Sequence, residues 1–298
     1  MTNILSQLQS YGQVLSSAPH RLAPLHASDP FSPMDELQRH YQDAGYLWLK
    51  QLLPRDEVFA FRHHFFSAMQ DTGLLKPGSD PVDGLFSDEE QTQRSHKRLM
   101  ELVRTAAYEA FCLHPNLYRF MDCFLGGMSY LHKRKIIRFT RPGEPNGTPA
   151  HYDLIYLRGG TDRVVTAWIP IGDIPAHMGG LVYLEGSDRV GRQMEADFSA
   201  MNAALSPEER ISAYNRNMTK GGWVSKDLPD MAERFSSRWL YADYESGDVM
   251  LHSPYMIHAA TANTDPCRLR LSTDIRYQNV SDEIDARWTQ HWTLDDML

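Results

Sequence analysis

The sequence has few cysteines, no long basic block and no long apolar run, and each shortage excludes a class of protein. Only three cysteines occur and none belongs to a CxxC pair, which argues against a disulfide framework and a thiolate zinc site. The net charge is −8 and the main basic cluster is the short HKRK at 132–135, so we expect no nucleic-acid partner. No apolar stretch approaches the roughly 18 residues of a membrane-spanning helix.

The composition is typical of a globular protein with a substantial core. The chain has 298 residues, of which 42% are hydrophobic and 23% are charged. Its N-terminus lacks the basic start and continuous apolar stretch of a secretion signal, so we expect a cytoplasmic protein that does not enter a membrane. We expect one domain over 1–298, and the sequence does not determine the oligomeric state.

The N-terminal part, 1–127, is predicted to be mainly helical. It begins with a weakly amphipathic stretch, followed by an irregular loop over 18–33 whose prolines break the periodicity. A short strand near Tyr46 precedes a helix that starts at Pro54. Apolar residues recur along that helix at spacings of three and four, namely Val58, Phe61, Phe65 and Met69. We interpret His63, His64 and His114 in this part as ordinary surface or core histidines.

Between residues 128 and 280 the pattern changes to that of an antiparallel β-fold. Short runs rich in Val, Ile, Tyr and Trp alternate with Gly, Pro and Asp. The runs are MSYLHKRKIIRFT, PAHYDLIYL, RVVTAWIPIGD, GGLVYLEGS, SRWLYADY, GDVMLHSPYMIHAA and RLRLSTDIRYQNV. The chain is therefore predicted to have an α+β fold, with a double-sheet barrel of the jelly-roll type and the N-terminal helices packed on one sheet. Residues 281–298 follow as a C-terminal tail.

A long polar segment, 189–236, interrupts the strand pattern. Long irregular segments inside a domain are usually functional, so this one is a candidate lid at one end of the barrel. Gly221 and Gly222 permit hinge motion and Trp223 could cover a pocket. Surface decoration is an equal alternative.

His151 and Asp153 lie two positions apart in the run PAHYDLIY. In a strand, alternate side chains share a face, so both polar groups point the same way while Tyr152 points the other. If that face is the interior of the barrel, an unpaired carboxylate there costs several kcal/mol, and coordination to a cation removes the penalty. A polar pair on a solvated face is the alternative.

A third ligand is available about a hundred residues downstream, in GDVMLHSPYMIHAATAN. We prefer His258, placed where the strand ends, because His252 lies among residues suited to core packing. Two histidines and one carboxylate on neighbouring strands are the facial arrangement that binds non-haem Fe(II), with open positions for oxygen and substrate. Such an open site is catalytic, since structural sites are usually closed.

The strand RLRLSTDIRYQ places alternate polar residues on one face: Arg268, Arg270, Ser272, Asp274 and Arg276. A solvated cationic face is one interpretation. The functional interpretation is that one arginine points into the metal pocket and holds a carboxylate in bidentate fashion. A metal that binds oxygen beside such a clamp implies an oxo-acid cosubstrate.

The chain resembles the phytanoyl-CoA dioxygenase-like (PhyH) group of Fe(II)/2-oxoglutarate-dependent oxygenases over roughly residues 130–280. The matching segments are HYD, TAWIPIGDI, GGLVYLEGSD, GDVMLHSPYMIHAATAN and RLRLSTDIRYQ, in the family's order. The resemblance implies a double-stranded β-helix, and iron ligands at His151, Asp153 and His258. It also implies a non-haem iron dioxygenase that uses 2-oxoglutarate and O2, oxidises a small organic molecule, for example one of secondary metabolism, and releases succinate and CO2.

Further roles follow from the resemblance. An arginine beyond the distal histidine binds the far carboxylate of 2-oxoglutarate; Arg268 and Arg270 both fit by counting, and the RLSxDxRYQ pattern favours Arg270. Trp168 stands where relatives place a tryptophan beside the cosubstrate, and Thr166 is a hydroxyl donor on the same strand face. Core and edge positions in a strand explain these two residues as well.

The chain also departs from its relatives. Asp188 replaces a frequent histidine of the pocket rim, and Ala259 and Ala260 stand where many relatives have a small hydroxyl or glycine. Asp153 argues against the halogenating variants, which lack a carboxylate at this position. The alternatives are a catalytically inactive jelly-roll binding protein and a zinc hydrolase with the same ligands. An acyl-CoA thioester, a free acid and a secondary metabolite all remain open as substrates.

Overall fold

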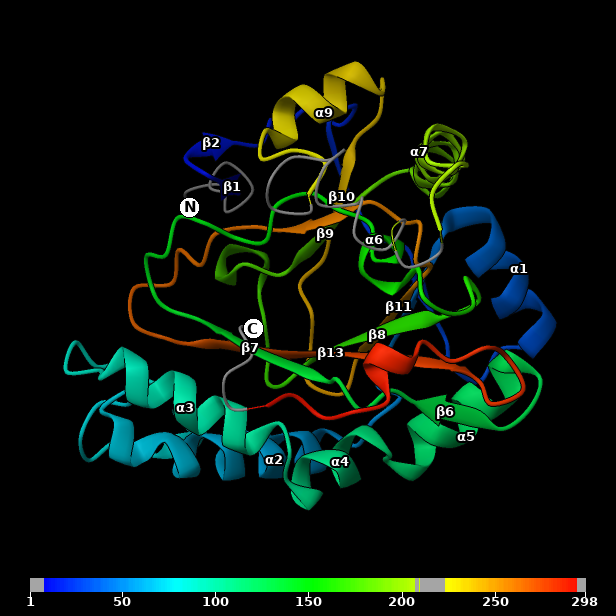
Figure 1. Ribbon diagram of the computed structural model, residues 1–298. Coiled ribbons are helices and arrows are strands. Elements are labelled where there is room, and N and C mark those ends of the chain that lie inside the picture. The colour runs from blue at the N-terminus through cyan, green and yellow to red at the C-terminus, as the bar shows by residue number, and fades with distance from the viewer. Residues whose placement is uncertain (1–7, 207–208, 210–222, 294–298) are drawn as a thin grey trace.

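The chain folds into two facing β-sheets with a layer of helices against the larger one (Figure 1). The computed structural model describes residues 8–206, 209 and 223–293. Within these ranges the two sheets share no strand, so the core is a two-sheet jelly-roll and not a closed barrel. The predicted α+β class with a double-stranded β-helix core is confirmed in this form.

The larger sheet contains the long strand β13 (Arg270–Asn279). It has the order β4-β5-β11-β8-β13-β6, with β7 also paired to β13. All its pairs are antiparallel except β4 with β5. The strands are β4 (Ala27–Ser28), β5 (Tyr46–Leu49), β11 (Val249–His252), β8 (Val165–Pro170), β13 (Arg270–Asn279), β6 (Ser129–Leu131) and β7 (Ile136–Thr140).

The smaller sheet faces it and has the order β12-β9-β10-β3. Its pairs are antiparallel except β10 with β3, which is parallel. The strands are β12 (His258–Ala260), β9 (Leu181–Leu184), β10 (Trp239–Tyr241) and β3 (Leu22–Pro24). An additional hairpin consists of β1 (Gln9–Ser10) and β2 (Gln13–Val14).

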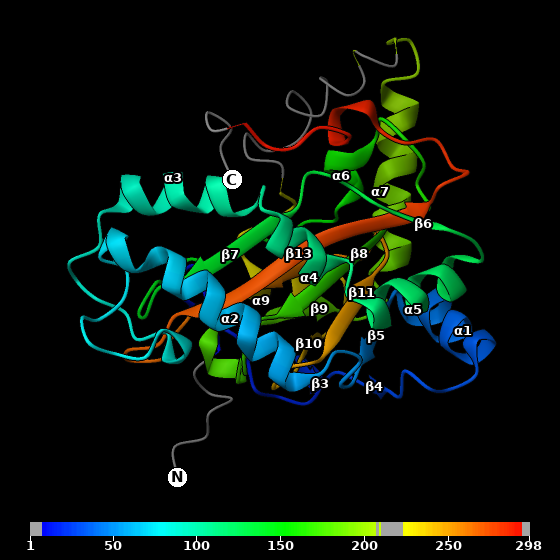
Figure 2. The ribbon, with the colours of Figure 1, turned by 90° about the horizontal axis from the view of Figure 1, so that it is seen from below.

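Helices cover the outer face of the larger sheet, as Figure 2 shows from below. The helices of the N-terminal part are α1 (Met34–Ala44), α2 (Arg55–Met69), α3 (Thr92–Leu102), α4 (Ala106–Cys112) and α5 (Pro115–Leu125). Phe61, Phe65 and Met69 of α2 share one apolar cluster with Ile169 and Leu251 of the sheet. Full burial of each such side chain stabilises the fold by roughly 1.5–3 kcal/mol. The prediction that N-terminal helices pack on one sheet is therefore confirmed.

The structure corrects the prediction for the extreme N-terminus. Instead of an amphipathic helix, residues 9–14 form a hairpin, because Tyr11 and Gly12 both adopt positive φ (50° and 76°), the geometry of a tight two-residue turn. The predicted loop over 18–33 supplies β3 and β4 at the edges of the two sheets, where short segments complete their hydrogen bonds on a neighbouring strand. The strand predicted near Tyr46 is present as β5.

The segment 189–236 is more regular than its sequence pattern indicated. It contains most of α7 (Asp188–Met201) and all of α9 (Leu228–Arg234), whose buried residues pack with Trp239 of the smaller sheet. Residues 207–208 and 210–222, including the predicted hinge at Gly221 and Gly222, lie outside the described residues. In the ranges that are described, no helix is both long and apolar enough to cross a membrane. The division of the chain at residue 127 and the tail after 280 stay predictions.

Candidate metal centre and its cavity

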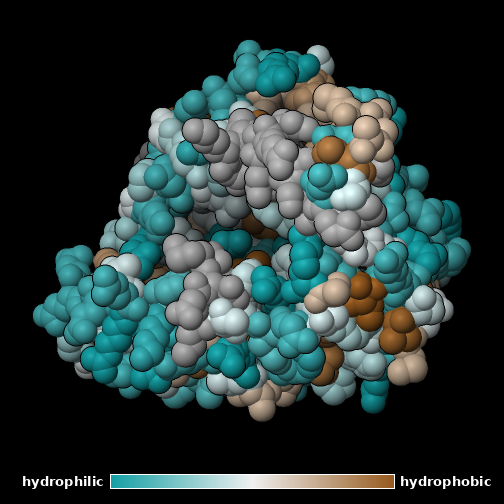
Figure 3. Space-filling view, in the orientation of Figure 1, coloured by the Kyte–Doolittle hydropathy of each residue, from teal (hydrophilic) through white to brown (hydrophobic). Residues whose placement is uncertain are grey.

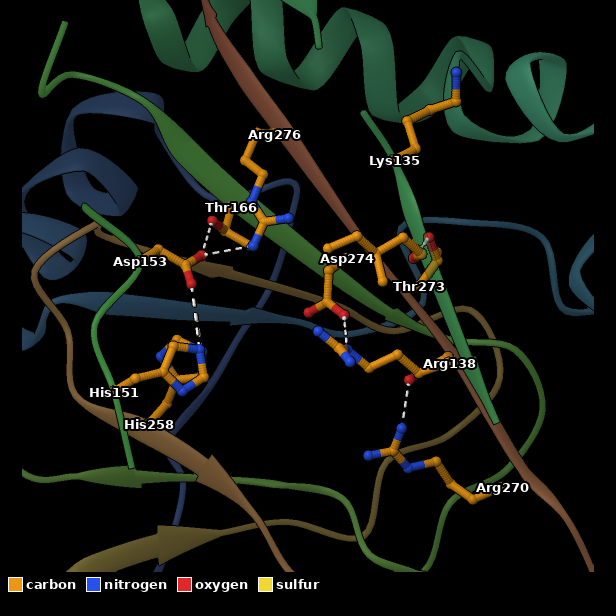
Figure 4. Close-up of polar contacts among 12 residues, drawn as sticks. Lys135, Arg138, His151, Asp153, Thr166, His258, Arg270, Thr273, Asp274 and Arg276 are labelled. Atoms are coloured by element: carbon orange, nitrogen blue, oxygen red, sulfur yellow. Dashed lines mark hydrogen bonds and ion pairs between the residues drawn. The ribbon is translucent and has the colours of Figure 1, made fainter. Parts of the chain in front are cut away.

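His151, Asp153 and His258 come together between the two sheets (Figure 4). Their possible ligand atoms all lie within 4.8 Å of one another, and all three residues are buried. Oδ1 of Asp153 lies 3.5 Å from Nε2 of His151 and 3.8 Å from Nε2 of His258. The structure therefore brings together the three residues that the sequence pattern selected.

The backbone achieves this arrangement differently from the prediction. His151 and His258 form a single antiparallel bridge, with N–H···O distances of 3.0 and 2.9 Å in the two directions. The run PAHYDLIY is not a strand, because the chain turns into the short helix α6 (Leu154–Leu157) directly after Asp153. His258 begins β12 instead of ending a strand. The bridge holds the two imidazoles side by side, with their ring centroids 4.4 Å apart.

Both imidazoles are oriented by backbone carbonyls. Nδ1 of His151 lies 2.8 Å from the carbonyl oxygen of Pro149, and Nδ1 of His258 lies 3.0 Å from that of Met256. A carbonyl can only accept, so each Nδ1 is the protonated nitrogen and each Nε2 presents a lone pair. Metal-binding histidines are fixed in this way by partners outside the coordination sphere.

The two oxygens of Asp153 have different environments. Oδ2 accepts a hydrogen bond of 2.5 Å from Thr166 and one of 3.2 Å from Nη2 of Arg276, and Nε2 of His252 lies 3.4 Å away. Oδ1 is buried, receives no hydrogen bond from the described residues and faces the two Nε2 lone pairs. A buried acceptor that faces two other acceptors is unfavourable unless a cation lies between them. The three residues thus fit a divalent metal ion.

The three groups around Oδ2 form a row across the larger sheet. Thr166 of β8 pairs with His252 of β11 on one side and with Arg276 of β13 on the other. Residues in register on neighbouring strands point to the same face, so all three side chains meet the same carboxylate oxygen. His252 also lies 3.0 Å from the hydroxyl of Tyr183 through Nδ1. This arrangement places His252 behind the aspartate instead of among the three grouped residues.

Electrostatics keep the candidate ligands in the protonation states that a metal requires. Burial alone would raise the pKa of Asp153, but the charge of Arg276, together with the neighbouring imidazoles of His151 and His252, holds this pKa well below its usual range. Burial, together with the neighbouring His252 and His151, lowers the pKa of His258 well below its usual value. The site therefore offers an ionised carboxylate and a neutral imidazole.

The three residues open onto a small cavity that also contains the predicted arginine and tryptophan. Its lining consists of Arg138, Thr148, His151, Asp153, Trp168, Leu181, His258, Arg270, Asp274 and Arg276. Figure 3 shows a hollow in the face of the molecule between the two sheets of Figure 1. A second, more open pocket shares Arg138, Thr148 and Arg270 with this cavity and runs to the surface beside α3. The two pockets therefore adjoin on the β7 side of the cavity, where these three residues separate them.

Arg270 and Arg268 have different surroundings. Arg270 is buried in the cavity wall, where Nε donates 3.0 Å to the carbonyl oxygen of Gly179 and Nη1 donates 2.7 Å to Oγ of Ser272. Burial lowers its pKa to about 10, which still leaves it charged at neutral pH. Arg268 lies outside the cavity lining and pairs with Asp265 through two contacts of 2.7 and 2.9 Å. Of the two arginines, only Arg270 faces the candidate metal centre.

Trp168 and Thr166 lie on the same face of β8, as predicted. Trp168 lines the cavity and packs against Tyr244, with ring centroids 4.7 Å apart. Thr166 does not line the cavity, because its hydroxyl donates to Asp153. Its predicted role as a hydroxyl donor to a cosubstrate stays a prediction, whereas its contact with the carboxylate is a finding.

The sequence interpretation missed Arg138 of β7 as a cavity residue. Nε of Arg138 lies 3.4 Å from Oδ2 of Asp274, and both residues line the cavity. Asp274 and Arg276 were placed correctly on the face of Arg270, but neither was given a role. No signal identifies Arg138, since the pairing of β7 with β13 is a long-range event that the run KIIRFT does not encode.

An internal part of the candidate lid, residues 224–225, lies beside the first ligand segment. Val224 donates a hydrogen bond of 2.6 Å to the carbonyl oxygen of Ala150, and Ala150 forms a bridge with Ser225. Trp223 therefore directly precedes Val224 and Ser225, which contact Ala150, the residue before His151. Its role as a cover stays a prediction.

Comparison with known proteins gives a family and a set of curated relatives. The family described as phytanoyl-CoA dioxygenase (PhyH) matches residues 41–270. The 1-deoxypentalenic acid 11-beta-hydroxylase of Streptomyces arenae is 24% identical over 259 residues, which cover 83% of this chain and 82% of the relative. The peroxisomal phytanoyl-CoA dioxygenase of Mus musculus is 27% identical over 244 residues, covering 76% of this chain and 63% of the relative.

Solved structures share the fold at lower sequence identity. The non-haem α-ketoglutarate-dependent epimerase SnoN from nogalamycin biosynthesis aligns with a TM-score of 0.55 and 16% identity, covering 89% of both chains. EctD from S. alaskensis with bound Fe aligns with a TM-score of 0.53 and 15% identity, covering 95% of this chain and 87% of the other. At these identities the likeness concerns the fold alone.

Proposed function

Because the chain belongs to the phytanoyl-CoA dioxygenase family, it is a non-haem iron enzyme, and we propose that it oxidises a small organic molecule with release of succinate and CO2. Its cofactors are Fe(II), 2-oxoglutarate as cosubstrate, and O2. Hydroxylation or a related oxidation is the expected reaction, since Asp153 supplies the carboxylate that halogenating variants lack.

His151, Asp153 and His258 hold the iron in this proposal. The observation that carries it is the orphaned Oδ1 of Asp153, which faces the Nε2 atoms of both histidines. When bound by two histidines and one carboxylate, Fe(II) keeps adjacent positions open and supplies the oxygen-activating chemistry. The row of Thr166, His252 and Arg276 occupies the other carboxylate oxygen, so Asp153 is held as a ligand through one oxygen only.

Arg270 binds the far carboxylate of 2-oxoglutarate. Each of the other two arginines in the cavity lining lies near an aspartate, whereas Arg270 contacts only neutral acceptors. A buried guanidinium without an anionic partner is costly, and a bound carboxylate removes that cost. The fork of Arg270 is suited to a bidentate contact with this carboxylate. Trp168 forms the adjacent wall of the cosubstrate site.

The alternatives are less well supported. A catalytically inactive binding protein does not need the grouped triad, and a zinc hydrolase with the same three ligands does not need the buried arginine clamp. Family membership and the presence of both features favour the oxygenase. The substrate is a small molecule, but relatives as different as a 1-deoxypentalenic acid hydroxylase and a nogalamycin epimerase leave its structure open.

The proposal is tested by a substrate screen with Fe(II), 2-oxoglutarate and O2, scored by succinate release. His258→Ala should lose iron in metal analysis and lose substrate-dependent succinate formation. His63→Ala, which changes an exposed histidine of α2, is the matched control and should retain both. Iron content and succinate formation that are unchanged in His258→Ala would contradict the assignment of the metal site.

A further inference from the structure

Arg276 is a buried cation directly behind the candidate metal centre. Arg276 is only 6% exposed to solvent, and its Nη2 atom lies 3.2 Å from Oδ2 of Asp153. Nε and Nη1 are also buried, and neither has a hydrogen-bond partner within the part of the chain that the structure describes. Figure 4 shows the guanidinium beside Asp153, with Asp274 and Arg138 following along the same wall of the cavity. Arg276 thus has donors that the protein alone does not satisfy.

The ion pairs around the cavity identify which arginine contacts no carboxylate among the described residues. Two of the three arginines in the lining lie near aspartates: Arg138 near Asp274, and Arg276 near Asp153. Arg270 is the third, and it donates its hydrogen bonds to neutral oxygens of Gly179 and Ser272. Before loading, the unbalanced positive charge therefore belongs to Arg270.

Loading moves this imbalance to Arg276. With Fe(II) and 2-oxoglutarate bound, Asp153 would share its charge with the metal, and the far carboxylate of the cosubstrate would neutralise Arg270. The pair of Arg138 and Asp274 would remain neutral. Asp153 is the carboxylate that Arg276 contacts among the described residues, so buried Arg276 would then carry an uncompensated positive charge. Such a charge is unfavourable unless an anion binds beside it.

We propose that the substrate carries a carboxylate and that Arg276 recognises it beside the iron. This inference rests on the proposed function, because the charge of Arg276 lacks a compensating anion only when metal and 2-oxoglutarate are bound. The two unpaired nitrogens of the guanidinium supply the donors for the acid group. Neutral esters or amides of the same molecules leave the buried charge uncompensated and bind weakly.

The test measures binding without turnover. Protein loaded with Ni(II) and the 2-oxoglutarate analogue N-oxalylglycine is titrated by calorimetry with a panel of apolar carboxylic acids, including 1-deoxypentalenic acid, each paired with its methyl ester. The wild type should bind at least one acid about tenfold or more tightly than its ester, since hydrogen bonds to a charged partner are strong. A panel in which no acid binds more tightly than its ester overturns the inference.

Variants separate recognition from support of Asp153. Arg276→Met should bind acids and esters equally, whereas Arg268→Met, which removes an arginine outside the cavity, should retain the preference for acids. Arg276→Lys keeps the charge and should still prefer acids if Arg276→Met fails to load. Acid preference that persists in Arg276→Met, or is absent from loaded Arg276→Lys, contradicts the inference.

Loading itself is measured first. Wild-type protein that does not bind Ni(II) or N-oxalylglycine contradicts the proposed function and, with it, the inference. Normal loading without acid preference contradicts only the role of Arg276.

Discussion

Thr166 donates a hydrogen bond of 2.5 Å to Oδ2 of Asp153, and Oδ1 is left as the carboxylate oxygen that receives no hydrogen bond from the described residues. The contact arises from register, because Thr166 stands between His252 and Arg276 in a row across three strands. The sheet therefore determines which oxygen of Asp153 is available to a metal.

Thr166→Val should weaken metal binding while preserving the shape of the side chain. Loss of a hydrogen bond that orients a metal ligand typically lowers metal affinity by about 10–100-fold, and we expect the lower end because Arg276 and His252 remain in contact with Oδ2. The apo-protein should lose about 1–2 kcal/mol of unfolding free energy. Titration with Co(II) and urea denaturation measure the two effects. Thr166→Ser retains the hydroxyl and should bind metal like the wild type. If Thr166→Val also binds Co(II) as tightly as the wild type, the hydrogen bond to Asp153 is not needed for metal binding.

Arg270→Met should raise the apparent KM for 2-oxoglutarate by about thirtyfold or more, because one partner of a buried charge pair is removed. Arg268→Met should leave this KM unchanged, since Arg268 pairs with Asp265 outside the cavity. Succinate formation as a function of 2-oxoglutarate concentration measures both. The reverse result would assign the clamp to Arg268.

Local patterns in the sequence predicted much of the fold and selected three residues that the structure brings together. Alternation along RLRLSTDIRYQ correctly placed Arg270, Asp274 and Arg276 on one face of β13, because side chains in a strand alternate. His151 and Asp153 were predicted to share a face for a partly wrong reason. Their side chains meet because His151 forms a β-bridge with His258 and the chain then turns into a short helix at Asp153. The two residues do not lie in one strand.

Long-range pairing was beyond the reach of these patterns. Arg138 reaches the cavity because β7 pairs with β13, and the row around Oδ2 of Asp153 depends on the register of three strands that are distant in sequence. The N-terminal hairpin depends on positive φ at Tyr11, which tyrosine adopts rarely. The helical part of 189–236 was missed because its buried positions are few, with Gly191 and Phe198 among them.

Stability should fall as the pH decreases from 6.5 towards 4, partly because of His132. Burial lowers the pKa of this histidine to about 4, although a hydrogen bond to Gln278 opposes the shift. Over this interval the unfolded chain binds a proton that the folded protein does not, so His132 contributes a loss of about 1.4 kcal/mol per pH unit. Urea denaturation across this pH range measures the slope. His132→Gln should reduce it by about that amount, whereas an identical slope in His132→Gln and in the exposed control His63→Gln would contradict the assignment.

Gly147→Ala should separate the two segments that carry the candidate histidines. A Cβ atom at residue 147 would lie 1.9 Å from the carbonyl oxygen of Ala260, a backbone atom of β12 that cannot rotate away. In the wild type, Ala260 donates a hydrogen bond of 3.0 Å to the carbonyl oxygen of Thr148, and the bridge between His151 and His258 continues the same pairing. Overpacking of this kind costs about 1–3 kcal/mol.

The same substitution should also lower the affinity for Co(II), because movement of residues 147–151 away from β12 displaces His151 relative to His258. Asn146→Ala is the matched control, since Asn146 is exposed and its truncation removes atoms instead of adding them. Urea denaturation and Co(II) titration of the two variants distinguish the outcomes. Gly147→Ala that matches Asn146→Ala in both measurements would mean that the close approach at Ala260 does not hold the two histidines together.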